Sequence, residues 1–232
     1  MEMSAFLLQD LRLLPVLAPM LLLSLTVHEF AHGRVALAFG DDTALRAGRL
    51  TLNPLKHLDP VGTAAIFLVG FGWARPVPVN PLAMTNRKTG EIAVSLAGPL
   101  SNLAMAILFA SILKLLLAAR IITYERIFLS EEMSLDSLLY IAASFAMSIN
   151  ILLCVFNLVP LFPLDGHHIL RELLPADRQA GFMAWQVKYG TVILMALIFV
   201  PSLFENMPDP ISEILIRAQW GFEIVFGLLP VI

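Results

Sequence analysis

Long apolar runs separated by short polar connections dominate the chain. Five runs approach or exceed the about 20 residues that an α-helix needs to cross a bilayer. They are residues 11–39, 91–119, 138–160, 184–204 and 211–230. A shorter run, Val61 to Phe71, is too short to cross and is typical of a re-entrant or interfacial segment. The pattern therefore predicts an all-α integral membrane protein with about five to six transmembrane helices.

The composition agrees with a membrane protein and excludes other classes. Of the 232 residues, 58% are hydrophobic and 14% are charged, whereas soluble domains have about 45–50% apolar and about 25% charged residues. The formal net charge of −3 lacks the basic surplus of a nucleic-acid-binding protein, so no nucleic-acid partner is expected. The single cysteine, Cys154, excludes an internal disulfide and a zinc site built from cysteines. We expect one polytopic domain over residues 1–232.

The basic residues of the connections indicate the orientation in the membrane. Under the positive-inside rule, segments 40–90 and 161–188 lie in the cytoplasm. These two segments carry Arg46, Arg49, Lys56, Arg75, Arg87, Lys88, Arg171, Arg178 and Lys188. The connection 120–137 has few basic residues beside several acidic ones. The first and third apolar segments therefore end on the cytoplasmic side, where their C-terminal ends can meet.

The first apolar segment contains the run His28-Glu29-Phe30-Ala31-His32. Histidines at positions i and i+4 lie on one face of a helix, one turn apart. Both can bind one zinc ion, with the intervening glutamate beside it as general base. The alternative is a pair of core histidines satisfied by hydrogen bonds. That alternative is weaker at membrane depth, because ionisable groups there cost about 2.5–3.5 kcal/mol each and are usually functional.

A hydrolytic zinc site needs a third protein ligand and an open position for water. The best candidate is Asp165, which follows Pro160 and Pro163 at the end of the third apolar segment. The prolines cannot continue a helix, so the backbone opens there and can direct the carboxylate to the metal. An Asp-Gly turn at a helix exit is the alternative. His167 and His168 are rival ligands, although adjacent histidines are more often part of an interfacial turn.

These motifs resemble the site-2 protease family of zinc intramembrane metalloproteases, in its small form without PDZ or CBS domains. The resemblance is carried by H-E-F-A-H at 28–32 and N-x-x-P-x-x-P-x-D-G at 157–166. It extends to A-G-P-L-S-N at 97–102, G-R-L-T-L-N-P at 48–54 and G-W-A-R-P-V-P-V-N-P at 72–81. The match covers about residues 20–170. We therefore expect a catalytic core over about 11–170, followed by C-terminal helices over about 184–230.

The resemblance implies roles for individual residues. His28, His32 and Asp165 would bind one Zn²⁺ per chain, and Glu29 would be the catalytic glutamate. Asn157 would lie in the catalytic region. Its amide is well placed to stabilise the oxyanion, with an interhelical hydrogen bond as the equally weighted alternative. Asn102 has the same ambiguity: packing and support of the site are favoured, and it is also a candidate for substrate contact.

The stretch Arg75 to Pro81 is predicted to be extended, because its three prolines exclude a helix. An extended edge near the active site can pair with an unwound substrate by strand addition. We therefore expect Val77, Pro78 and Val79 to bind substrate. A plain interfacial loop is the alternative, and the resemblance implies a membrane-associated β-hairpin.

The expected function is an endopeptidase that cuts single-pass transmembrane proteins near the cytoplasmic side of a bacterial or archaeal inner membrane. Regulated intramembrane proteolysis and clearance of signal-peptide remnants both fit this chemistry. The rival from another class is a zinc transporter or metal-sensing membrane protein, which can use Glu29 as a ligand rather than as a free base. A non-catalytic chaperone on the same scaffold is disfavoured, because all four zinc-site residues are present.

Overall fold

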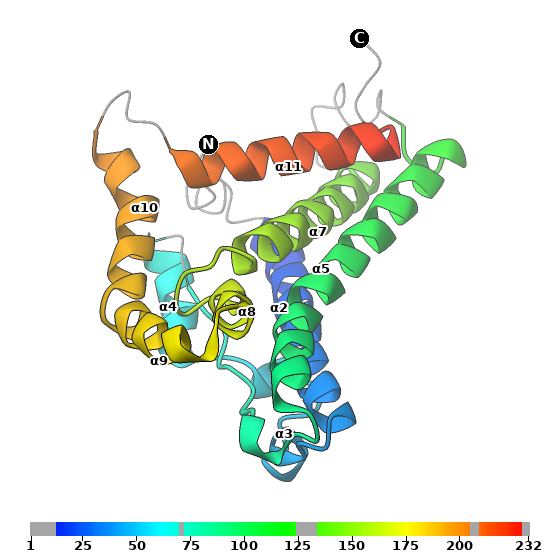
Figure 1. The fold of residues 1–232 in the computed structure, drawn as a ribbon. Coiled ribbons are helices and arrows are strands. Elements are labelled where there is room, and N and C mark those ends of the chain that lie inside the picture. The colour runs from blue at the N-terminus through cyan, green and yellow to red at the C-terminus, as the bar shows by residue number, and fades with distance from the viewer. Residues whose placement is uncertain (1–12, 70–71, 124–133, 205–208, 229–232) are drawn as a thin grey trace.

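The computed structural model describes residues 13–69, 72–123, 134–204 and 209–228, and it is helical through most of these ranges (Figure 1). Four helical stretches are long and apolar enough to cross a membrane. Three are α2 (Leu14–Ala38), α5 (Arg87–Ala118) and α7 (Leu135–Asn157). The fourth is Ala176–Pro201. It runs through α9 (Ala176–Trp185), the π-helical turn η4 (Gln186–Gly190) and α10 (Thr191–Leu203).

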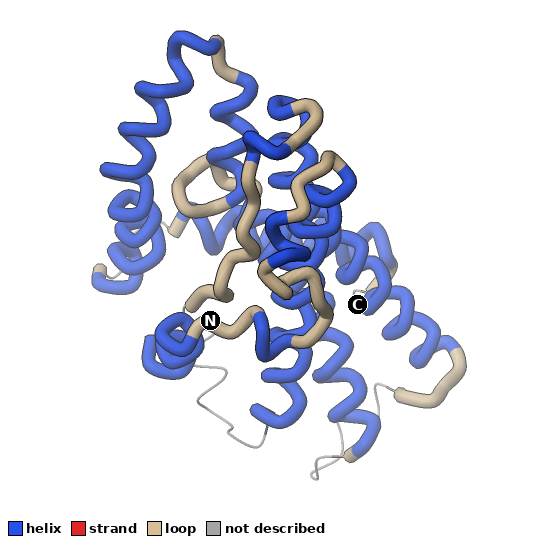
Figure 2. Tube along the Cα trace, turned by 90° about the horizontal axis from the view of Figure 1, so that it is seen from below, coloured by secondary structure: helices blue, strands red, loops and turns tan. Residues whose placement is uncertain are grey.

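Shorter helices connect these spans. Between α2 and α5 lie α3 (Thr43–Arg46), η2 (Pro54–Lys56), α4 (Pro60–Val69) and η3 (Pro81–Ala83). After α7 the chain forms α8 (Asp165–Leu173), and the last described helix is α11 (Pro210–Phe226). Seen from below, the loops gather in the middle of the helical framework (Figure 2). They therefore lie where residues from different spans can meet.

The all-α class predicted from the sequence is confirmed, and the first four long apolar segments correspond to the four spanning stretches. The fifth segment, 211–230, differs. Its helix α11 has 17 residues, is not among the four candidate spans, and lies across one end of the other helices in Figure 1. This helix also carries an exposed ion pair between Glu213 and Arg217. The count of five to six spans stays a prediction.

The short run Val61 to Phe71 corresponds to α4, which has 10 residues and is too short to cross. Residues 70–71 lie outside the described chain, as do residues 11–12 and 229–230 at the ends of two predicted segments. In the described residues the β-structure beside α4 is one isolated antiparallel bridge between Leu58 and Ala74. The Arg75 N–H also donates to the carbonyl of His57 at 2.8 Å. The predicted β-hairpin therefore stays a prediction.

Helix α5 is the centre of the packing and contacts α2, α7 and α8. Small side chains on α5 allow this close approach: Ala106 and Ala110 are fully buried against Met147 and Ile151 of α7. Without a hydrophobic driving force between helices in lipid, such close packing is a main source of association. The α2–α5–α7 core thereby places one face of α2 against both partners.

A buried ion cluster fixes α8 on α5. Arg171 of α8 forms ion pairs with Glu91 of α5 and with its own neighbour Glu172. Both carboxylates are buried, with 5% and 6% of their side-chain surface exposed. Arg87 adds a second cation to Glu91 from the exposed end of α5. Because Asp165 is the first residue of α8, this cluster also orients the helix that presents it.

Replacing Arg171 by Met should lower the free energy of unfolding by about 3–5 kcal/mol, because the buried Glu172 loses the ion pair with Arg171 and the buried Glu91 keeps only the exposed Arg87. Denaturant unfolding in detergent micelles, followed by circular dichroism, measures this loss. The matched control is Arg217→Met, which breaks an exposed pair on α11 and should cost at most about 1 kcal/mol. Equal stability of the two variants would contradict the anchoring role of Arg171.

Candidate metal centre

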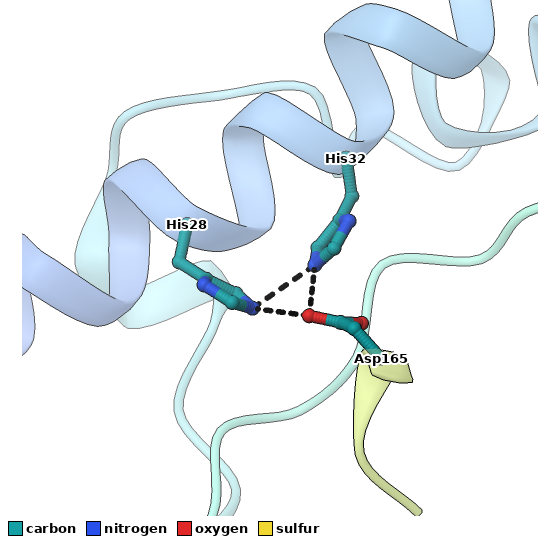
Figure 3. A group of neighbouring side chains, drawn as sticks. All are labelled: His28, His32 and Asp165. Atoms are coloured by element: carbon teal, nitrogen blue, oxygen red, sulfur yellow. Dashed lines mark hydrogen bonds and ion pairs between the residues drawn. The ribbon is translucent and has the colours of Figure 1, made fainter. Parts of the chain in front are cut away.

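Three side chains from two distant parts of the chain converge on one point (Figure 3). His28 and His32 project from successive turns of α2, and Asp165 projects from the start of α8. The Nε2 atoms of the two histidines are 3.0 Å apart. The Oδ2 atom of Asp165 lies 3.3 Å from Nε2 of His28 and 3.4 Å from Nε2 of His32. The structure thus brings together the three predicted metal ligands.

The donor set fits a zinc ion. Two imidazole nitrogens and one carboxylate oxygen are usual zinc ligands, and tetrahedral bonds of about 2.0–2.2 Å separate the donors by about 3.3 Å. The observed separations of 3.0, 3.3 and 3.4 Å lie close to this value. The Oδ2 atom of Asp165 is also buried without a hydrogen-bond partner, which is costly unless a cation binds there. Three protein ligands leave a fourth position for water or substrate.

Carbonyl oxygens orient both imidazoles. The Nδ1–H of His28 donates to Oδ1 of Asn102 at 2.6 Å, and the Nδ1–H of His32 donates to the carbonyl of Val94 at 2.7 Å. A carbonyl can only accept, so each Nδ1 carries the proton and each Nε2 presents its lone pair to the centre. Such outer contacts fix the tautomer and the ring orientation that a metal requires.

Asn102 is held by a second amide that the sequence reasoning missed. Its Nδ2 donates to Oδ1 of Asn150 at 2.7 Å, and Nδ2 of Asn150 donates to Oγ of Ser24 at 2.7 Å. All three side chains are fully buried. They belong to α5, α7 and α2 respectively, so the chain of hydrogen bonds joins the three core helices. The available signal was a polar side chain in the middle of the apolar run 138–160.

Gly98 of α5 makes room for the two histidines. A methyl group built on its Cα would lie 2.4 Å from Cε1 of His28 and 2.4 Å from Nε2 of His32. No side chain fits at that distance, so α5 can support both rings only through a glycine. This is the structural role of the glycine in the A-G-P-L-S-N motif.

Glu29 lies beside the three ligands but outside their group. Its Oε2 accepts a hydrogen bond from the backbone N–H of Val77 at 2.8 Å. The extended segment after Ala74 is thereby attached to α2, and Arg49 supports it by donating to the carbonyls of Arg75 and Pro76. A carboxylate that is adjacent to the metal ligands and is not one of them can act as a base.

The other candidate residues differ in burial and in their hydrogen-bond partners. Asn157 is half-buried at the end of α7, where its Nδ2 donates to the carbonyl of Leu153 at 2.9 Å in its own helix. Asn102 is fully buried with its hydrogen bonds directed to protein groups, which fits support of the site. Val77 is buried, whereas Pro78 and Val79 are half-buried. The role of each of these residues in catalysis or substrate binding stays a prediction.

The rival ligands His167 and His168 are outside the three-residue group. The Nδ1–H of His167 donates to the carbonyl of Leu164, and its ring packs against Phe162. Burial, followed by the neighbouring His167, lowers the pKa of His168 to about 4. Asp165, in contrast, lies within 3.4 Å of the Nε2 atoms of both His28 and His32. Asp165 is therefore the carboxylate that this geometry directs to the imidazoles.

Comparison with known proteins also points to zinc chemistry, as the geometry of the site does. The profile of Peptidase family M50 matches residues 16–200. The chain is 41% identical over 199 residues to YwhC of Bacillus subtilis, named as a candidate zinc metalloprotease, with 86% of this chain and 87% of YwhC covered. It is 31% identical over 188 residues to Rip2 of Mycobacterium tuberculosis, which is named in the same way, with 78% and 66% covered. No solved structure gives a significant match.

Replacing Gly98 by Ala should abolish zinc binding, because the added methyl group displaces both imidazoles. The zinc content of the purified protein, measured by atomic absorption, checks this. Gly181→Ala on α9 is the matched control, since an added methyl there meets nothing within 4 Å. A Gly98→Ala variant that still carries one zinc per chain would refute the packing argument.

Replacing Asn102 by Ala should weaken zinc binding about 10–100-fold, because the acceptor that orients His28 is lost. Asn102→Asp keeps an acceptor oxygen for His28 and should retain more of the affinity. Competition with a chromophoric chelator gives the affinities of both variants. Equal affinities for the wild type and Asn102→Ala would show that Asn102 does not orient the ligand.

Proposed function

This chain belongs to peptidase family M50, the site-2 protease family, and is a membrane zinc metalloprotease; from this we propose that it cuts single-pass transmembrane proteins near the cytoplasmic face of the membrane. The observation that carries the proposal is the group of His28, His32 and Asp165, with the carboxylate of Glu29, which is not a member of the group, beside it. Regulated intramembrane proteolysis and clearance of signal-peptide remnants are the two processes that this activity would serve.

The proposed reaction divides the work among a few side chains. His28, His32 and Asp165 would hold the zinc, and the bound ion would supply Lewis-acid chemistry by lowering the pKa of a water towards about 7 and polarising the scissile carbonyl. The Glu29 carboxylate takes the proton of the attacking water and returns it to the leaving amine. The N–H of Val77 keeps one Glu29 oxygen turned towards the extended segment, which leaves the other oxygen for proton transfer.

Asn157 is proposed to donate to the oxyanion of the tetrahedral intermediate. One such donor is worth about 2.7–4 kcal/mol in other enzymes. In the chain without substrate, its amide donates to the carbonyl of Leu153. A rotation of the Asn157 side chain would release it for the substrate, and catalytic hydrogen bonds often form only in the substrate complex.

The substrate is proposed to enter as an unwound strand beside Val77, Pro78 and Val79, because an intact helix keeps its carbonyls hydrogen-bonded. The extended segment can offer only a short pairing edge. The N–H groups of Arg75 and Val77 are already used by His57 and Glu29, and the prolines have none. Within the part of the chain that the structure describes, the C=O of Val77 and the N–H and C=O of Val79 make no hydrogen bond, and we propose that they pair with the substrate.

The orientation also belongs to the proposal. Two of the three proposed metal ligands, His28 and His32, lie in the C-terminal half of α2, and the connection that follows α2 carries the basic residues expected of a cytoplasmic segment. The centre therefore lies nearer the cytoplasmic side, in a bacterial or archaeal inner membrane. We treat the chain as one domain, with its catalytic core over about 11–170 and its C-terminal helices over about 184–230.

Replacing Glu29 by Gln should leave one zinc per chain and lower the cleavage rate about 10²–10⁴-fold, because the base is lost and the ligands are kept. Asp165→Ala should lose the zinc itself. Zinc analysis is paired with a cleavage assay in proteoliposomes on a panel of single-pass substrates. Loss of zinc from Glu29→Gln would make Glu29 a ligand and favour metal transport, and full cleavage by this variant would exclude it as the base.

A further inference from the structure

The loop that delivers Asp165 is an interruption of helical structure beside the spans. Helix α7 ends at Asn157 and α8 begins at Asp165, with Pro160 and Pro163 between them. Backbone N–H and C=O groups in such a break lose their helical partners. At membrane depth each of them must find another partner within the protein.

Gln186 supplies two of these missing partners. Its Oε1 accepts a hydrogen bond from the N–H of Phe162 at 2.9 Å, and its Nε2 donates to the carbonyl of Pro160 at 2.8 Å. The side chain is almost fully buried, with 1% of the residue exposed. A single amide thus satisfies one donor and one acceptor of the broken segment, as a neighbouring peptide group would.

The local structure around Gln186 is adapted to this contact. Gln186 begins the π-helical turn η4, and Gly190 ends it. A methyl group on Gly190 would lie 2.7 Å from Oε1 of Gln186 and 3.0 Å from Cβ of Phe162. A glycine is therefore required for the loop to lie against the helix. Single π-turns within α-helices are rare and are frequent at functional sites.

The hydrogen bonds of Gln186 also affect the position of Asp165, because the loop between them is compact. The N–H of Leu164 donates to the carbonyl of Leu161 at 2.9 Å, so the residues after Pro160 form a closed turn. Gly166 then packs directly on the backbone, because a methyl group there would lie 2.3 Å from the carbonyl oxygen of Leu158. The loop and the start of α8 are one compact unit, and its position fixes the carboxylate.

The span that carries Gln186 has few other attachments. Of the four candidate spans, Ala176–Pro201 has the smallest buried share, 17%. Its main contacts with other helices are with α8 and α11, and α10 stands apart from the α2–α5–α7 core in Figure 1. The two hydrogen bonds of Gln186 are therefore a substantial part of the connection between this span and the metal centre.

We propose that Gln186 is a positioning residue, which holds the Pro160–Asp165 loop so that Asp165 reaches the two imidazoles. The span Ala176–Pro201 thereby sets the position of the third ligand from outside the catalytic core. This inference rests on the proposed zinc site. It predicts that a displacement of this span weakens metal binding even though no residue of the span touches the metal.

The test compares Gln186→Met, which has a similar length and no polar head, with Gln179→Met. Gln179 lies on the same stretch of helix, and its amide donates to the carbonyl of Leu174, away from the loop. Zinc affinity is measured by chelator competition, and ligand geometry by the visible spectrum of the Co²⁺-substituted protein. We expect Gln186→Met to bind zinc 10–100-fold more weakly with an altered Co²⁺ spectrum, and Gln179→Met to stay within twofold of wild type.

The outcomes separate this inference from the proposed function. A wild-type protein that binds no zinc would refute the proposed function. A wild type that binds zinc, with Gln186→Met within twofold of it and an unchanged Co²⁺ spectrum, would overturn the role of Gln186 alone. Equal losses in both variants would show a general effect of the helix and would also overturn it. Should Gln186→Met not fold, Gly190→Ala gives the same readouts, because its methyl group displaces the loop while Gln186 is kept.

Discussion

Each polar group that this chain carries to membrane depth must find its partner within the protein, because hydrocarbon offers none. The two histidines are the clearest case. Each uses one ring nitrogen to donate to a carbonyl oxygen, of Asn102 or of Val94, and keeps the other for the metal centre. The need to satisfy one nitrogen therefore sets the direction of the other. The hydrogen bonds that satisfy the two histidines in the membrane thus also set the geometry of the metal centre.

The same constraint explains how distant helices are connected. The side chains of Asn102, Asn150 and Ser24 form one chain of hydrogen bonds across α5, α7 and α2. Neutral amides suit this purpose, because each offers a donor and an acceptor without the cost of a buried charge. The buried charges of Arg171, Glu91 and Glu172 occur instead where α8 meets the start of α5. There the ion pairs orient the helix that begins with Asp165.

The metal centre fits beside α5 because this helix has no side chain at Gly98. Gly98 lets this helix approach both imidazoles, and the backbone carbonyl of Val94, one turn earlier, reaches His32. The extended segment after Ala74 approaches α2 from elsewhere in the chain, and the N–H of Val77 reaches Glu29. The proposed base and the proposed ligands are thus supported by different elements. A change in one support need not disturb the other.

The sequence by itself determined the features that depend on local spacing. Apolar runs of sufficient length gave the all-α membrane class, the i and i+4 histidines shared a face of α2 as any helix requires, and Pro160 and Pro163 marked the break before Asp165. Only the tertiary structure decided which groups meet across helices. The acceptor for His28, the partner Asn150 and the attachment through Gln186 join residues far apart in the chain, and no local period encodes them. The transverse position of α11, which packs against α7, is likewise a tertiary feature that hydropathy averaged along a segment does not resolve.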